Sequence, residues 1–159
     1  MAPDVSAPAV DLFATPWGWA AAAWSTRGVR SLILPRPERR EAAAAIERAA
    51  GPGARRRPRE ELRRQLREYL KGRRRVFSIP LDFEVTGSFT GRVLAFAKDV
   101  PYGSTVTYGE VARAVGSPGA ARAVGGAMSR NPLPILIPCH RVVAADGPGG
   151  FSGVWPTFR

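Results

Sequence analysis

The chain has 159 residues, of which 45% are hydrophobic; this is enough for one sizeable domain or two small ones and argues against global disorder. Its single cysteine excludes an internal disulfide, and one cysteine with one histidine argues against a structural zinc site, which usually needs four such ligands. The formal net charge of +11 favours a polyanionic partner, and since no apolar run reaches the ~18 residues of a membrane span, nucleic acid is expected before a membrane surface.

The first elements predicted along the chain are a loose terminus and a β-hairpin. Residues 1–10 are rich in proline and alanine and are expected to be loose. The apolar, tryptophan-containing run 17–24 and the run 29–34 flank a Ser-Thr-Arg-Gly turn sequence, a pattern typical of a hairpin. The alanines of the first run also suit a helix, but its aromatic residues and Gly18 favour a strand.

Two helices and an extended segment are predicted next. Residues 38–50 have helical propensity, and the Gly-Pro-Gly sequence after them ends that helix. The basic stretch 55–75 places its apolar residues on one helical face: Leu62, Leu66, Tyr69 and Leu70. Its arginines are therefore mostly the exposed side of an amphipathic helix, where they attract phosphate in general or are simply solvated. Residues 77–82 are expected to be an extended linker to a second unit.

Three short helices are predicted in the second half. Ser88 is expected to cap a helix whose apolar residues are Phe89, Val93, Leu94 and Phe96. Thr107 and Glu110 have the spacing of a capping box at the start of a helix that runs to about Val115. After a Gly-Ser-Pro-Gly turn, residues 120–128 are expected to form another helix. Two short helices joined by a glycine-containing turn suggest a helix-turn-helix.

The helix predicted at 120–128 has very small side chains, with Arg122 as the one large exception. The pair Gly125 and Gly126 costs helix stability, roughly 1 kcal/mol per glycine relative to alanine. A helix that accepts this cost needs close backbone approach, either to a ligand or to another helix. The residues of this stretch alone leave both explanations open.

The chain's only cysteine lies beside its only histidine, in the run Ile-Leu-Ile-Pro-Cys-His-Arg-Val-Val at 135–143. Cys139 and His140 thus pair a soft nucleophile with a base. The alternative is a buried, inert thiol with an incidental neighbour.

Four motifs in this order resemble the O6-alkylguanine-DNA alkyltransferases, also called methylated-DNA–protein-cysteine methyltransferases. The similarity is dense from about residue 80 to 153, and looser at 15–18 and 66–72. The Pro-Cys-His-Arg-Val block after a helix pair is highly specific for this family. The motifs are Tyr-Gly-Glu-Val-Ala at 108–112, Ala-Arg-Ala-Val-Gly at 121–125, Asn-Pro at 131–132 and Pro-Cys-His-Arg-Val-Val at 138–143.

The resemblance implies an α+β fold and a repair reaction. A small N-terminal α/β domain (ribonuclease H-like, with an antiparallel sheet) would span residues 1–79. A mainly helical domain with the helix-turn-helix and the active site would span residues 80–159. The implied activity is single-turnover transfer of an alkyl group from O6 of guanine, and also O4 of thymine, in double-stranded DNA to Cys139. It needs no cofactor or metal, and the protein would be a cytoplasmic monomer.

The resemblance also assigns roles to single residues. His140 would activate the Cys139 thiol through a water, because a free thiol with a pKa of about 8.5 is mostly protonated at neutral pH. Tyr108 would protonate the leaving guanine. The target base must be flipped out of the duplex, and Arg122 would enter the vacated space. The positions that match DNA contacts are Arg122, Ala121, Ala123 and Arg141, and those of the substrate pocket are Asn131, Met128, Val142, Phe151 and Ser152.

Within the substrate pocket, the resemblance gives Ser152 a hydrogen bond to O6 of guanine and Asn131 the task of bracing the active-site turn. It also explains the small side chains at 120–128, which would let that helix approach the minor groove.

The chain departs from the family pattern near its end. Phe151 stands where the family usually has tyrosine, and residues 154–159 do not match the final helix, whose glutamate orients the histidine. Asp146 could replace that glutamate, but nothing in its position in the sequence supports this role. The sequence therefore also allows a protein that binds alkylated DNA without transferring the alkyl group, or a decayed enzyme. A helix-turn-helix regulator is disfavoured, because the second helix has few side chains able to read base edges.

Overall fold

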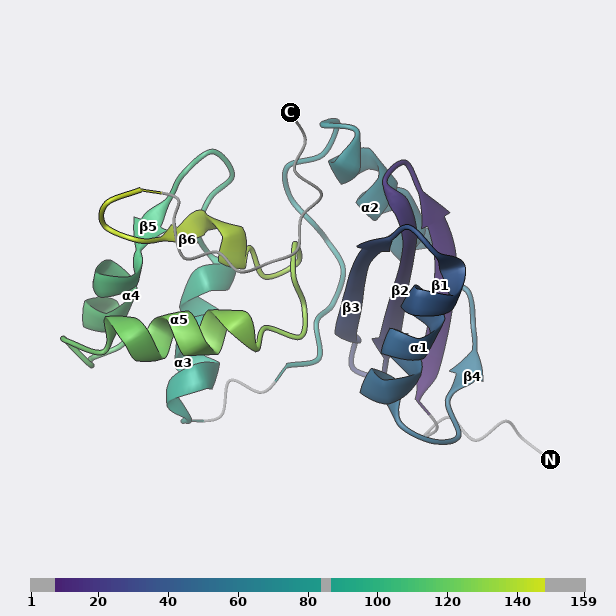
Figure 1. Ribbon diagram of the computed structural model, residues 1–159, viewed down its shortest axis with the longest axis horizontal. Coiled ribbons are helices and arrows are strands. Elements are labelled where there is room, and N and C mark those ends of the chain that lie inside the picture. The colour runs from purple at the N-terminus through teal and green to yellow at the C-terminus, as the bar shows by residue number, and fades with distance from the viewer. Residues whose placement is uncertain (1–7, 84–86, 148–159) are drawn as a thin grey trace. The chain divides into compact units, whose positions relative to one another are not determined.

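The computed structural model describes residues 8–83 and 87–147, which fall into two compact units (Figure 1). The first unit comprises the described part of residues 1–83 together with 132–134, and the second comprises that of residues 84–131 and 135–159. The first contains a sheet and two helices, and the second is mainly helical. The predicted α+β class is confirmed.

A four-stranded sheet forms the centre of the first unit, in the order β3-β2-β1-β4. The strands β1 (Ala9–Thr15), β2 (Gly18–Trp24) and β3 (Val29–Arg36) are antiparallel, whereas the two-residue β4 (Arg55–Arg56) runs parallel to β1. The predicted hairpin is confirmed as β2 and β3, and the alanine run is a strand. The four alanines of β2 are completely buried, because both faces of the sheet are covered.

The expectation of a loose terminus up to residue 10 is wrong for its last two residues. Strand β1 begins at Ala9, and Val10 is buried against the first helix. The sequence of this strand does not show the usual alternation of apolar and polar residues, because one of its buried side chains is the carboxylate of Asp11. A sequence pattern built on apolar residues therefore does not identify the strand.

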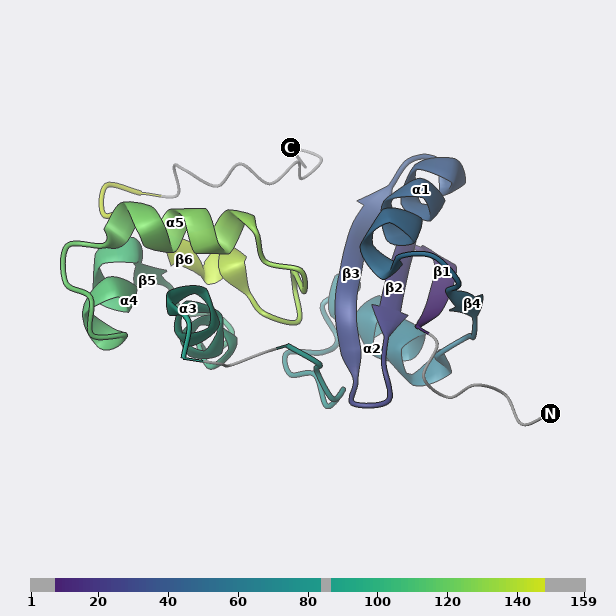
Figure 2. The ribbon, with the colours of Figure 1, turned by 90° about the horizontal axis from the view of Figure 1, so that it is seen from below.

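The two helices of the first unit lie on opposite faces of the sheet (Figure 2). Helix α1 (Arg39–Ala50), predicted at 38–50, packs its buried residues Ala42 and Ile46 against the face formed by Val10, Ala21 and Ala23. Helix α2 (Glu60–Leu70) lies on the other face, where its Arg63 binds Asp11 through both Nε and Nη2. Burial alone would raise the pKa of Asp11, but the hydrogen bonds from Arg63 and from the Arg59 backbone outweigh it and lower the pKa.

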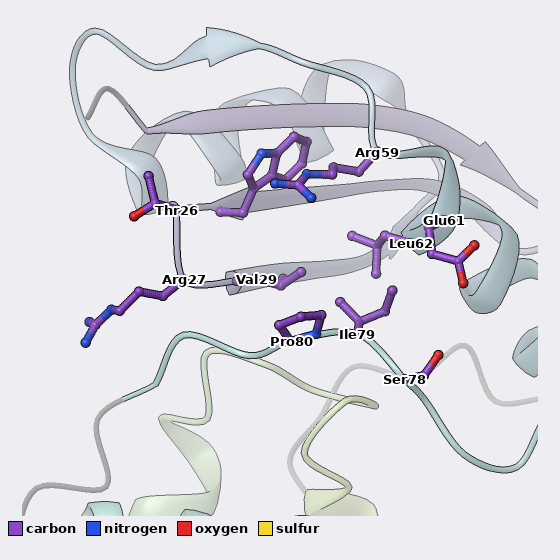
Figure 3. Close-up of a pocket in the computed structure, with 11 residues that line it drawn as sticks. Thr26, Arg27, Val29, Arg59, Glu61, Leu62, Ser78, Ile79 and Pro80 are labelled. Carbon is purple, nitrogen blue, oxygen red and sulfur yellow. The ribbon is translucent and has the colours of Figure 1, made fainter. Parts of the chain in front are cut away.

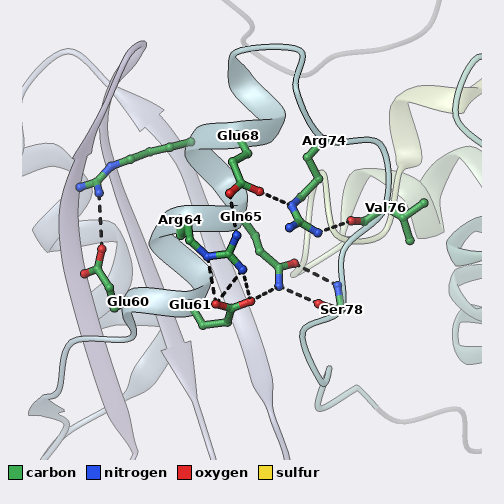
Figure 4. A network of polar contacts seen from close by, with 9 residues as sticks. Glu60, Glu61, Arg64, Gln65, Glu68, Arg74, Val76 and Ser78 are labelled. Carbon is green, nitrogen blue, oxygen red and sulfur yellow. Dashed lines mark hydrogen bonds and ion pairs between the residues drawn. The ribbon is translucent and has the colours of Figure 1, made fainter.

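Helix α2 confirms the amphipathic pattern, with its three leucines on the buried side. On the polar side Arg64 pairs with Glu61 and Glu68, at 2.7 and 2.6 Å, and Arg74 donates to Glu68 at 2.7 Å (Figure 4). A good part of the basic face is therefore neutralised within the unit. The buried Gln65 binds the chain that follows, since it donates to Ser78 Oγ at 2.7 Å and accepts from the Ser78 amide at 2.9 Å.

The predicted linker is extended and hydrogen-bonded to the hairpin. The amide of Val29 donates to the Pro80 carbonyl at 2.9 Å, and that of Asp82 donates to the Val29 carbonyl at 2.8 Å. A Cβ on Gly28 would lie 2.4 Å from the Pro80 carbonyl oxygen, so only glycine permits this approach. Beside the linker lies a cavity of about 170 Å³ bordered by apolar side chains and a few polar ones (Figure 3).

Three helices form the core of the second unit: α3 (Phe89–Lys98), α4 (Tyr108–Ala114) and α5 (Ala121–Ser129). The predicted caps are confirmed, since Ser88 Oγ accepts from the Gly91 amide at 3.0 Å and the capping box of Thr107 and Glu110 is complete. The helices bury Val93, Leu94, Ala97, Val111, Ala112, Val124 and Ala127. No helix among the described residues is both long and apolar enough to cross a membrane.

A two-residue parallel ladder joins distant segments of the second unit. Strand β5 (Val106–Thr107), just before α4, pairs with β6 (Val142–Val143). Strand β6 directly follows the 3₁₀ helix η1 (Cys139–Arg141). The ladder therefore brings the start of α4 close to the segment that carries the chain's only cysteine.

Candidate active site

Cys139 is the first residue of η1, directly after a tight backbone turn. The Cys139 amide donates to the Ile137 carbonyl at 2.8 Å, and Pro138 between them has φ −78° and ψ 68°. These are the values of an inverse γ-turn, and the proline ring restricts φ to this range in advance. The Arg141 amide closes the following turn by donating to the Pro138 carbonyl at 2.9 Å. The Ile-Pro-Cys-His-Arg sequence thus folds locally into two successive hydrogen-bonded turns.

Ile135, just before this turn, has the left-handed backbone conformation. Its φ is 71°, although its side chain is β-branched and 2% exposed. A β-branched residue in this region costs about 1–3 kcal/mol and persists only where the surrounding packing imposes it. The side chain of Ile135 is itself buried, as are Leu136 and Ile137 after it, and this burial opposes the cost. The entry to the cysteine turn is therefore strained backbone anchored by apolar packing.

The Cys139 thiol is buried and has hydrogen-bond donors directed at it. Its residue is 6% exposed, and this burial raises the pKa of the thiol. The Asn131 amide and the backbone amides of Cys139 and His140 oppose the rise by hydrogen bonding to sulfur. At neutral pH the resting group is therefore a thiol, and the hydrogen bonds that lower its pKa would stabilise the thiolate once a proton leaves.

Asn131 connects the end of α5 to the cysteine turn. Its backbone amide donates to the Met128 carbonyl at 3.2 Å, and its side-chain Nδ2 donates to the Ile137 carbonyl at 2.8 Å. The same side chain is hydrogen-bonded to the sulfur. The side-chain amide of Asn131 thus binds both the backbone of the γ-turn and the thiol of Cys139.

His140 is uncharged at neutral pH in this environment. Burial lowers the pKa of its imidazole to about 4, and the positive charge of Arg141 adds to the shift. A neutral imidazole can accept a proton, which a protonated one cannot. The combination of a protonated thiol and a neutral base is the starting state for general-base activation of sulfur.

The ladder and helix α4 place Tyr108 in the same unit as this pair. Tyr108 is half-buried at the first position of α4, and Val142 is buried opposite Val106 in the ladder. A Cβ built on Gly125 of α5 would lie 4.0 Å from Cε1 of Tyr108. The ring therefore lies over the glycine of the neighbouring helix. Met128, near the end of α5, is buried.

The residues predicted to contact DNA have different surroundings. Arg122 and Ala123 are exposed on α5, and Ala121 is half-exposed. Arg141 is half-buried, donates from Nη1 to the Val100 carbonyl at 2.6 Å and stacks on the Tyr102 ring, with its guanidinium carbon 5.4 Å from the centroid. Phe151 and Ser152 lie outside the described residues, and Asp146 is exposed in the turn at 144–147.

Sequence reasoning missed two contributors to this site. Arg141 contacts Val100 and Tyr102, which lie about forty positions earlier in the sequence, and no local sequence pattern predicts contacts over that separation. The left-handed Ile135 was hidden in an apolar run, because isoleucine is among the residues least expected in that conformation. Only the tertiary packing identifies either of them.

Comparison with known proteins places these features in one family. A family model described as "6-O-methylguanine DNA methyltransferase, DNA binding domain" matches residues 88–157. A methylated-DNA–protein-cysteine methyltransferase of Methanosarcina acetivorans is 47% identical over 87 residues, which cover 55% of each protein. The constitutive enzyme of the same name from Bacillus subtilis is 45% identical over 94 residues, covering 58% of this chain and 56% of the relative. The aligned segment spans about half the length of these curated relatives.

Solved structures match over more of the chain. The crystal structure of Mycobacterium tuberculosis OGT in complex with DNA has a TM-score of 0.72 and 32% identity, and the match covers 87% of this chain and 80% of that one. The O6-methylguanine-DNA methyltransferase of Pyrococcus kodakaraensis has a TM-score of 0.66 and 30% identity, with 89% of each chain covered. The similarity therefore extends well beyond the segment around the cysteine.

Proposed function

Since the chain belongs to the O6-methylguanine-DNA methyltransferase family, we propose that it repairs alkylated double-stranded DNA by moving the alkyl group from O6 of guanine to Cys139. The observation that carries the proposal is the buried Cys139 thiol on a turn that Asn131 holds through the Ile137 carbonyl at 2.8 Å, with a neutral imidazole at the next residue. A buried cysteine kept only for packing would need neither. O4-alkylated thymine is proposed as a second substrate.

The reaction that fits these groups is a single displacement at the alkyl carbon. His140 takes the thiol proton, through a water, and the sulfur forms a bond to the alkyl carbon as the bond to O6 breaks. Tyr108 supplies a proton to the leaving guanine as negative charge develops on it. The product thioether is not hydrolysed, so each protein molecule reacts once. The reaction as written requires no cofactor or metal.

The DNA must present its base outside the helical stack, because the O6 atom is unreachable in a stacked duplex. Exposed Arg122 and Ala123 on α5, with the adjacent glycines, support α5 as the element that approaches the duplex. We propose Arg122 as the side chain that fills the vacated space, with Ala121 and Ala123 as contacts. Asn131, Met128 and Val142, with Phe151 and Ser152 from the sequence match, are proposed to line the base pocket.

Three broader expectations belong to the same proposal. Residues 1–79 and 80–159 act as separate domains, of which the second binds DNA and carries the reaction. The protein works as a cytoplasmic monomer, since a reactive thiol needs a reducing compartment to stay free.

Intact-protein mass spectrometry tests the proposed activity directly. The chain is incubated with a duplex that contains one O6-methylguanine, with Cys139→Ser as the control. The expected result is a gain of one methyl group that saturates at one per protein and is absent in the control. A folded protein that binds the lesion duplex without gaining mass would instead be a lesion-binding protein. A duplex with O4-methylthymine tests the second substrate in the same assay.

The role of Arg122 is tested by comparing two substrates. Arg122→Ala should slow transfer from the lesion duplex, because no side chain would then fill the space that the flipped base leaves in the stack. Transfer from the free O6-alkylguanine base needs no flipping and should keep its rate. An equal loss on both substrates would exclude a role in base flipping.

A further inference from the structure

Arg141 is attached to the segment that follows helix α3. Its Nη1 donates to the Val100 carbonyl at 2.6 Å, and its guanidinium lies over the Tyr102 ring. Val100 is buried, and its own amide bonds back into the last turn of α3. Val100 lies two residues beyond the last residue of α3, near the negative end of the helix dipole, where a cation is favourable.

The same residue is part of the turn that carries the cysteine. The Arg141 amide donates to the Pro138 carbonyl at 2.9 Å, which closes η1 around Cys139. Its side chain fixes one end of this turn to the end of α3, while Asn131 fixes the other end through the Ile137 carbonyl. The sulfur is therefore carried by a turn that two side chains anchor from different elements.

We infer that Arg141 is a positioning residue that holds the cysteine-bearing turn against the end of α3, in place of the DNA-contact role that its motif implies. The inference rests on the proposed alkyl transfer. Arginine suits the position because its planar guanidinium can stack on a ring and donate in its own plane at the same time. A lysine ammonium ion could supply the charge but not this combination.

Two substrates and three variants separate positioning from DNA contact. Transfer rates are measured with the lesion duplex and with free O6-benzylguanine, for Arg141→Met, Arg141→Lys and Tyr102→Leu. Arg48→Met is the matched control, since it removes an exposed arginine from α1 of the first unit. Thermal melting of every variant verifies that it is folded.

A positioning role predicts equal losses on both substrates. Arg141→Met should slow both reactions by the same factor, about 10- to 100-fold, because a small displacement of a reacting atom has a cost of this size. Arg141→Lys should remain well below the wild-type rate. Tyr102→Leu should give a smaller loss, since it removes the stacked ring but leaves the hydrogen bond of Arg141 to the Val100 carbonyl. Affinity for undamaged duplex should fall no more than in Arg48→Met.

The pH dependence of the transfer rate is a further measurement, which a purely structural role of Arg141 would leave unchanged. The charge of Arg141 lowers the pKa of His140, in addition to burial. Arg141→Met should therefore shift the acid limb of the transfer rate to higher pH, whereas Arg48→Met should leave it in place.

Several outcomes would overturn the inference. Loss on the duplex alone, with a wild-type rate on the free base, would make Arg141 a DNA contact. Full activity of Arg141→Lys would mean that charge alone suffices. If the wild-type chain transfers no alkyl group, the proposed function fails. The inference is then decided by iodoacetamide, which should label Cys139 several-fold faster in Arg141→Met than in Arg48→Met, because a loosened turn exposes the thiol. Equal labelling would reject it.

Discussion

His140 makes the stability of this chain depend on pH in a range where few other groups titrate. The pKa of its imidazole is lowered to about 4, against an ordinary value of about 6.5 in an unfolded chain. Between these two values the unfolded state binds a proton that the folded state does not. The histidine therefore contributes stability that is fully present above pH 6.5 and is lost as pH falls towards 4.

We predict that His140 alone lowers the free energy of unfolding by up to about 3 kcal/mol between pH 6.5 and pH 4. Urea unfolding at a series of pH values measures it. The chain has one histidine, so His140→Gln should remove the slope above pH 5, where carboxylates contribute little. A slope that survives in His140→Gln would show that the imidazole is not the buried group responsible.

Asn131 is predicted to control how readily Cys139 ionises. Its amide binds both the sulfur and the Ile137 carbonyl, so Asn131→Ala should raise the pKa of the thiol further and cost about 1–3 kcal/mol of stability. The rate of iodoacetamide labelling against pH reports the pKa. Ser129→Ala is the matched control, because it removes one hydrogen bond near the end of α5, to the Gly126 carbonyl. A thiol pKa that moves equally in both variants would contradict the assignment.

At the scale of the residue, the sequence nominates Cys139 and His140 as the reacting pair that we propose, but not the residues that hold them in place. The adjacency of the only cysteine and the only histidine was sufficient to nominate Cys139 and His140. The contact of Arg141 with Val100 and Tyr102 depends on how α3 packs against η1, which no local pattern encodes. The types of residue in a sequence indicate which groups can react, whereas only the tertiary contacts show which residues hold those groups in position.

At the scale of the element, helix α5 shows why its glycines need an explanation beyond packing. Alanine at Gly125 would make an ordinary contact with Tyr108, and alanine at Gly126 would lie 3.5 Å from a flexible arginine, that of Arg130. The unbound structure therefore has room for both methyl groups. Close packing against another helix does not require these glycines, which leaves approach by a ligand as the explanation that accounts for their cost.

We predict that Gly125→Ala and Gly126→Ala each stabilise the chain by about 0.5–1 kcal/mol, since alanine restricts the unfolded state and favours the helix. Both should weaken binding of a lesion duplex if α5 approaches the groove. Thermal unfolding and fluorescence anisotropy measure the two effects. Gly109→Ala in α4, where a Cβ would also meet only a flexible arginine, is the control that should stabilise without weakening binding. Undiminished lesion binding in the α5 variants would remove the argument for close approach.

Elements were predictable where local chemistry specifies them. The capping box of Thr107 and Glu110, the cap at Ser88 and the leucine stripe of α2 all appear at the expected positions. The missed strands are those whose pairing is decided elsewhere. Strand β1 buries Asp11 because α2 supplies Arg63, and the two residues of β4 are a strand only because β1 lies beside them.

At the scale of the whole molecule, the 24 lysine and arginine side chains behind the net charge of +11 are not equally available to a polyanion. Arg64 lies between Glu61 and Glu68, and Arg63 is bound to Asp11. These guanidinium groups are already partnered inside the first unit, whereas Arg122 is an exposed side chain on α5. Equal formal charges should therefore contribute unequally to a polyanionic ligand, because only a cation that meets a phosphate releases a counterion.

The salt dependence of binding to undamaged duplex distinguishes these two kinds of arginine. We predict that affinity falls steeply as salt rises, and that Arg122→Gln reduces the slope of log affinity against log salt by about one. Arg64→Gln removes the same formal charge but should leave the slope unchanged, since its guanidinium pairs with carboxylates. Fluorescence anisotropy titrations across salt concentrations measure both. Equal slope changes would mean that the field of the whole chain, and not contact through α5, governs association, because a diffuse field cannot distinguish one arginine from another.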